Sequence, residues 1–184
     1  MKKDTVSPRT KRLALLGILG AQALVLSFLE NLIPAIPGLP PGAKPGLSNI
    51  VTMFTAAAIG PVDALCIAVL KALFAGLTRG LTAGLMSLAG GLLSTLVMVL
   101  LLHLKKNPFG ILGVSVAAAV AHNAGQLLVA CLLSGTAALV WSYGPLLLLF
   151  GILAGILTGI FLKLLFPVLL KQSRFFGISI NLQQ

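Results

Sequence analysis

The chain has 184 residues, of which 58% are hydrophobic and only 9% are charged, and its mean hydropathy is +1.10. Soluble domains carry about 25% charged residues, so this composition excludes a water-soluble fold and predicts an integral membrane protein. The formal net charge of +10 comes from 13 Lys and Arg against 3 Asp and Glu. Because the basic residues lie at the ends of apolar runs, we interpret them as topology signals and not as a nucleic-acid surface.

The N-terminal part of the chain predicts a basic tail followed by a membrane span. Residues 1–12 are polar and basic, and residues 13–33 form an apolar run that exceeds the roughly 20 residues a span needs. Ala21 and Ala23 flank a glutamine, which resembles a signal-peptide cleavage site. The apolar run continues well past this point, so we expect an uncleaved first span.

The rest of the chain predicts five more apolar segments and a polar tail. Residues 34–48 are rich in proline and glycine and therefore cannot form a helix. Glycine, proline and basic residues separate the later segments, and residues 134–144 are expected to form a loop. The predicted spans after the first are at about 47–59, 62–77, 81–104, 109–133 and 145–170. Residues 171–184 are expected to form a cytoplasmic tail, so one membrane domain covers residues 13–170.

The distribution of basic residues tests this topology. With six spans and both termini in the cytoplasm, nine Lys and Arg lie inside and only two, Lys44 and Arg79, lie outside. If the short second segment did not cross, every later segment would reverse and this bias would nearly vanish. We therefore predict an all-α membrane protein with six transmembrane helices and cytoplasmic N- and C-termini.

A polar cluster lies in the middle of the apolar segment 113–130. His122 and Gln126 are four residues apart, so they share one helix face, and Asn123 lies about 100° from His122. Polar side chains in a membrane helix are costly unless they face a partner or a cavity, and they are often functional. The alternative is that they hydrogen-bond between helices to hold the bundle together.

Other polar residues are expected in the outer half of the membrane. These are Glu30, Asn49, Lys71 and Arg79, with Trp141 and Tyr143 in the last outer loop. We predict a pocket that opens to the outside and has its floor near His122. As alternatives, Lys71 could extend to the headgroups, and Glu30 could form a structural ion pair. Glycines recur at four-residue spacing at 151, 155 and 159, which predicts a close-packing face on the last span.

The residue inventory argues against an enzyme. The three acidic residues, at positions 4, 30 and 63, are scattered, whereas a magnesium site for diphosphate chemistry needs clustered carboxylates. His103 and His122 fall on different helices, so a zinc or haem pair is not expected. The sequence predicts no catalytic residue, no metal site and no cofactor. Energy for any transport would come from a partner or an ion gradient.

Three stretches resemble those of one family of small bacterial membrane proteins. They are PGAKPGLSNIVT at 41–52, SLAGGLLS at 87–94 and AHNAGQLLVA at 121–130. The family, called Gx transporters, often carries the label heptaprenyl diphosphate synthase component I, and the likeness extends over about 13–165. It is in turn similar to the S components of energy-coupling-factor importers. Those are six-helix proteins that capture a vitamin-like solute outside the cell and dock on a coupling subunit with two ATPases.

The resemblance implies roles for particular residues. The loop around Lys44 would act as a lid, and Asn49, His122, Asn123 and Gln126 would contact the solute. On the first span, Gly17 and Ala21 would contact the coupling subunit, although ordinary packing explains them equally well. Members of the family also resemble the membrane partner of a NusG-like extracytoplasmic domain in flavin-based electron transfer.

The leading hypothesis is therefore an S-component-like subunit of the bacterial cytoplasmic membrane that captures a small organic, vitamin- or cofactor-like solute. Its outer half carries Lys44, Lys71 and Arg79 against Glu30, a net charge of about +2 that favours an anionic or carboxylate-bearing solute. The alternative is a membrane anchor without transport activity, which would recruit a partner for extracytoplasmic electron transfer or for prenyl-quinone metabolism.

Overall fold

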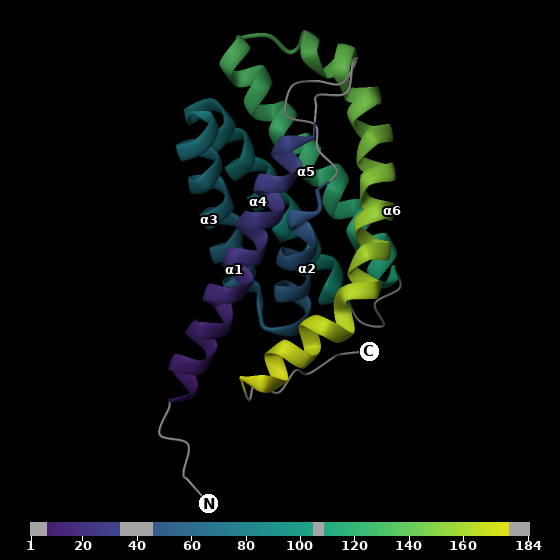
Figure 1. Cartoon of the computed structure of the whole chain (residues 1–184). Coiled ribbons are helices and arrows are strands. Elements are labelled where there is room, and N and C mark those ends of the chain that lie inside the picture. Colours follow the sequence, from purple (N-terminus) through teal and green to yellow (C-terminus); the bar gives the residue numbers. More distant parts are fainter. Residues whose placement is uncertain (1–6, 34–45, 105–108, 177–184) are drawn as a thin grey trace, which may run out of the picture.

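The computed structural model describes residues 7–33, 46–104 and 109–176. Over these residues the chain forms six α-helices and no strand (Figure 1), which confirms the predicted all-α fold. The helices are α1 (Pro8–Leu32), α2 (Ser48–Ala58), α3 (Pro61–Arg79), α4 (Leu81–Leu102), α5 (Gly110–Ser134) and α6 (Ala138–Phe175).

Local sequence signals set several helix ends. The Ser7 hydroxyl accepts a hydrogen bond from the Thr10 backbone N at 3.2 Å, and Pro8 occupies the first turn, so α1 begins before the predicted span. Gly80 separates α3 from α4 with a φ of 93°, a conformation that favours glycine. This glycine therefore explains the break between the predicted spans 62–77 and 81–104.

The last helix is longer than predicted. Residues 138–144, which were expected in a loop, belong to α6, and the helix continues through Pro145 and Pro167. A proline removes one backbone hydrogen bond from a helix, but membrane helices tolerate this where neighbouring groups satisfy the freed carbonyl. The C-terminal part of α6 runs across one end of the bundle (Figure 1). There the side chain of Gln172 accepts a hydrogen bond from Gln22 of α1 at 3.3 Å.

Glycines bring the backbones of α3 to α6 close together. A Cβ on Gly84 would lie 2.9 Å from Gly76 Cα, and a Cβ on Gly125 would lie 2.7 Å from the Ala89 carbonyl oxygen. The predicted packing face of α6 is confirmed, because a Cβ on Gly155 would lie 2.5 Å from Val116 Cα in α5. Side chains at these crossings would force the helices apart.

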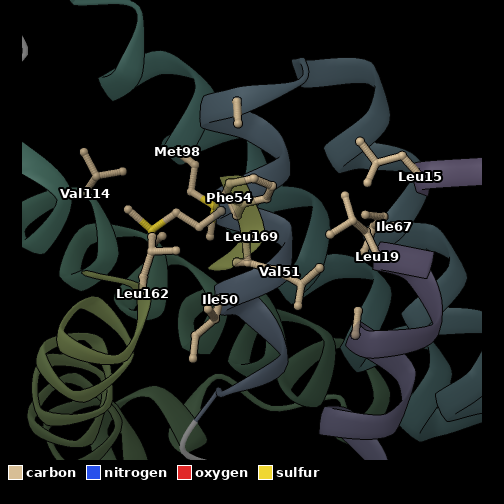
Figure 2. Close-up of a cluster of buried hydrophobic side chains, with 14 residues drawn as sticks. Leu15, Leu19, Ile50, Val51, Phe54, Ile67, Met98, Val114, Leu162 and Leu169 are labelled. Carbon is tan, nitrogen blue, oxygen red and sulfur yellow. The ribbon is translucent and has the colours of Figure 1, made fainter. Parts of the chain in front are cut away.

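The short helix α2 lies inside the bundle. Nine of its eleven residues are buried, and it contacts α1, α3, α4 and α6. Its Phe54 packs edge-on against Phe166 of α6 with ring centroids 5.5 Å apart, and Met98 of α4 lies beside Phe54 (Figure 2). The other five helices are long and apolar enough to span a membrane, whereas α2 is shorter than 18 residues.

Polar contacts at both ends of α1 fix the direction of α2. Near the end of α1, Glu30 accepts a hydrogen bond from Ser48 at the start of α2. Near the beginning of α1, Arg12 pairs with Asp63 in the first turn of α3. Arg12 and Glu30 are 18 residues apart in the sequence, or about 27 Å along a helix. The chain therefore returns from one end of α1 to the other through α2, as six alternating spans require. The count of six spans and the cytoplasmic termini stay predictions.

Candidate functional site

Seven of the eight predicted site residues line a single cavity, which we call the polar cavity. It is lined by residues of all six helices and has a volume of about 60 Å³. The predicted residues that line it are Glu30, Asn49, Lys71, Arg79, His122, Asn123 and Gln126. The eighth, Lys44, lies outside the described residues.

Glu30 attaches the beginning of α2 to the end of α1. One carboxylate oxygen accepts from the backbone N of Leu47, and the other accepts from the Ser48 hydroxyl at 3.2 Å. A carboxylate at a helix N-terminus binds amide groups that the helix itself cannot satisfy. Glu30 is also close enough to Lys71 and Arg79 to interact electrostatically with both. Glu30 therefore holds the start of α2 and also lines the polar cavity.

Lys71 points into the polar cavity and does not extend to the headgroups. Only 6% of the residue is exposed, and its ammonium group donates a hydrogen bond to the Asn49 Oδ1 atom at 2.6 Å. This bond connects α3 to the second residue of α2. Arg79, at the end of α3, is exposed and lines the same cavity, so the two cations come from one helix.

The α5 wall contains the residues that first indicated a site. A Cβ on Gly90 would lie 2.8 Å from the His122 carbonyl oxygen, so the close approach of α4 depends on this glycine. The Nδ1 atom of His122 is buried and has no hydrogen-bond partner among the described residues. A buried polar atom without a partner is unusual, and here it belongs to a residue that lines the cavity.

Asn123 also holds two helices together. Its Nδ2 atom donates to the Leu147 carbonyl oxygen of α6 at 2.9 Å, so the alternative of interhelical bonding holds for this residue. Asn123 lines a second, apolar hollow between α5 and α6, with a volume of about 200 Å³. Its side chain thus lies between the polar cavity and this hollow.

Sequence reasoning missed the small hydroxyl residues of the polar cavity. They are Ser27, Ser48, Ser87, Ser115 and Thr158. Ser115 and Thr158 hydrogen-bond to each other at 2.8 Å between α5 and α6. The helical period could have identified Ser115, because it lies seven residues before His122 on the same face. Thr158 gave no such signal, because it lies alone in an apolar run.

The two residues expected to contact a coupling subunit lie on the outside of the bundle. Gly17 and Ala21 are exposed on α1, and a Cβ on Gly17 would meet no atom within 4 Å. Packing within the described part of the chain therefore does not explain Gly17. Contact with a partner stays a prediction for both residues.

The described part of the chain contains no group of three or more His, Cys, Asp or Glu side chains that could hold a metal ion. The polar cavity instead presents ammonium, guanidinium, amide, imidazole and hydroxyl groups around a single carboxylate. Such a set can bind and orient a polar solute through hydrogen bonds and charge.

Comparison with known proteins gives two matches. The model of a family described as heptaprenyl diphosphate synthase component I matches residues 19–165. A solved structure of the S component of a bacterial ECF transporter matches with a TM-score of 0.68 and 23% sequence identity, over 89% of this chain and 97% of that chain. No curated protein matches. The S-component-like fold and the multi-pass membrane location are thereby supported, whereas a NusG-like partner occurs in neither match and stays a prediction.

Proposed function

Because the chain belongs to the heptaprenyl diphosphate synthase component I family and has the fold of an ECF-transporter S component, we propose that it is a substrate-binding membrane subunit. It would capture a small organic, vitamin- or cofactor-like solute from outside the cell. A membrane coupling subunit with ATPases would then supply the energy for uptake. The proposal gives this chain a binding role and no catalytic role.

One observation carries this proposal. Polar residues that are scattered over α1, α2, α3 and α5 in the sequence line one cavity inside an apolar bundle. Polar groups that served only to hold helices together would be expected at separate helix crossings. Their gathering around a shared space is instead typical of a ligand site.

The position of the polar cavity fits capture from outside. Its charged residues lie toward the end of the bundle where α1 ends and α2 begins. The Arg12–Asp63 ion pair marks the opposite end, which the distribution of basic residues predicts to be cytoplasmic. In this orientation the solute would enter near Arg79 and reach His122 and Gln126 at greater depth.

The direct test is a thermal-shift screen of the full chain purified in detergent. Vitamins, flavins and prenyl phosphates are the probes. A solute at 100 times its dissociation constant stabilises the folded state by about 2.7 kcal/mol, which would raise the unfolding midpoint by several degrees. If no probe raises the midpoint while a membrane partner still copurifies, the chain is an anchor and not a capture subunit.

The matched variants are Gln126→Leu and Gln172→Leu. Gln126 lines the polar cavity, whereas Gln172 bonds to Gln22 elsewhere in the bundle. We expect Gln126→Leu to weaken solute binding at least tenfold, because a buried hydrogen bond to the solute is lost. Gln172→Leu should leave binding unchanged even if it lowers the unfolding midpoint. Equal affinity in the two variants would contradict the assignment of the site.

A further inference from the structure

The charges of the polar cavity do not balance. Lys71 and Arg79 contribute two cations to its wall, and Glu30 contributes one anion. The whole sequence contains only two other acidic residues, Asp4 and Asp63. Asp63 pairs with Arg12 at the opposite end of the bundle, and Asp4 lies outside the described residues. Among the described residues, Glu30 is therefore the one side-chain carboxylate that lines the polar cavity.

The hydrogen bonds that Glu30 already accepts reduce its capacity to accept hydrogen bonds from a solute. Its two oxygens accept hydrogen bonds from Leu47, which precedes α2, and from Ser48, the first residue of α2. The Lys71 ammonium has three donor hydrogens, and its bond to Asn49 uses one of them on a neutral amide. The cationic donors of Lys71 and Arg79 thus share the polar cavity with a carboxylate whose two oxygens already accept hydrogen bonds from the chain.

From this imbalance, and on the premise that the polar cavity captures a solute, we propose that the solute is an organic anion. Its carboxylate or phosphate group lies between Lys71 and Arg79, and its other polar atoms reach His122 and Gln126. A surplus cation in a membrane protein is costly unless an opposite charge accompanies it. An anionic solute supplies that charge, whereas a cationic solute would add to the repulsion.

Matched pairs of solutes that differ mainly in charge test the proposal. The probes are nicotinate with nicotinamide, pantothenate with panthenol, and the phosphorylated and unphosphorylated forms of riboflavin and pyridoxal. The full chain in detergent is titrated with each, and its unfolding midpoint is measured. We expect the anionic member of at least one pair to bind at least tenfold more tightly than its neutral partner. The first two pairs report on a carboxylate and the last two on a phosphate.

The variants Lys71→Gln and Arg79→Gln connect this preference to the cavity. Each should reduce the affinity for the anionic probe at least tenfold and lessen the difference between the members of the pair. Arg79 is exposed, so its variant is expected to fold even if Lys71→Gln does not. Lys163→Gln is the matched control, because Lys163 is exposed on α6 and does not line the polar cavity.

The outcomes separate this proposal from the one it depends on. If probes bind but no anionic member stabilises the protein more than its neutral partner, the anion proposal is overturned and capture stays intact. Anion binding that survives both Lys71→Gln and Arg79→Gln would also overturn it. If no probe of any charge changes the midpoint, both the anion proposal and the capture function fail.

Discussion

At the scale of single residues, neighbouring polar side chains of α5 make different contacts. Asn123 lines the polar cavity and also donates to the Leu147 carbonyl oxygen of α6. Gln126 lines the cavity one turn further along the helix. From sequence spacing alone, both residues belong to one polar cluster. The hydrogen bond of Asn123 to α6 could not be predicted, because it joins parts of the chain that are distant in sequence.

This difference predicts different effects of Asn123→Leu and Gln126→Leu on the empty protein. Asn123→Leu should lower the free energy of unfolding by about 1 kcal/mol, since an interhelical hydrogen bond in a membrane protein contributes roughly that amount. Gln126→Leu should lower it by less than about 0.5 kcal/mol, within the usual range for a residue without a structural bond. Denaturant unfolding in detergent without added solute measures both. A larger loss for Gln126→Leu would reverse the assignment.

At the scale of helices, α4, α5 and α6 approach each other through glycine. A Cβ on Gly155 would collide with the α5 backbone, while a Cβ on Gly17 would meet nothing within 4 Å. We therefore expect Gly155→Ala to lower the free energy of unfolding by about 1–3 kcal/mol through overpacking. Gly17→Ala should not lower it, because alanine favours helix over glycine by about 1 kcal/mol. The same unfolding measurement compares the two variants, and equal losses would contradict this account of the crossings.

The sequence predicted most of the helices and the charged, amide and imidazole residues that line the polar cavity. Apolar run length and charged breaks identified five helices within a few residues, and the glycine spacing of α6 identified its packing face. The predicted start of α6 was wrong. A proline often marks a helix boundary, but Pro145 lies inside this helix. Ser27, Ser87 and Thr158 were missed because a hydroxyl group does not interrupt an apolar pattern. Their place at the cavity depends on how the helices rotate against each other.

At the scale of the whole molecule, the alternation of α1, α2 and α3 determines which side of the membrane each later helix end faces. Since α2 connects the two ends of α1, both termini are predicted in the cytoplasm and the α5–α6 connection outside. A fluorescent protein fused after residue 184 should fluoresce, and alkaline phosphatase fused after Gly135 should be active. The reverse pattern would show that the bundle is inserted in the opposite orientation, which would place the polar cavity on the wrong side for capture.

The exposed face of α1 gives a separate prediction about assembly. If Gly17 and Ala21 contact a coupling subunit, Gly17→Leu should reduce copurification of that subunit and leave solute affinity unchanged, because neither residue lines the polar cavity. Gly17→Ala, which adds one carbon, should reduce it less. A pull-down of membrane partners, run beside the thermal-shift titration, measures both effects. Unchanged copurification with Gly17→Leu would assign the partner contact to another surface.

The hydrogen bond between Lys71 and Asn49 has a consequence for how a partner distinguishes the loaded protein from the empty one. Asn49 accepts a hydrogen bond from the Lys71 ammonium group, which holds the first turn of α2 against α3. The proposed anionic solute binds the same ammonium group. A solute that binds this ammonium group must compete with Asn49 of α2 for it. Solute binding and the position of α2 therefore become thermodynamically linked. The empty and loaded forms would then present different outer surfaces. A partner that distinguishes them could respond only to loaded subunits and would not spend ATP on empty ones.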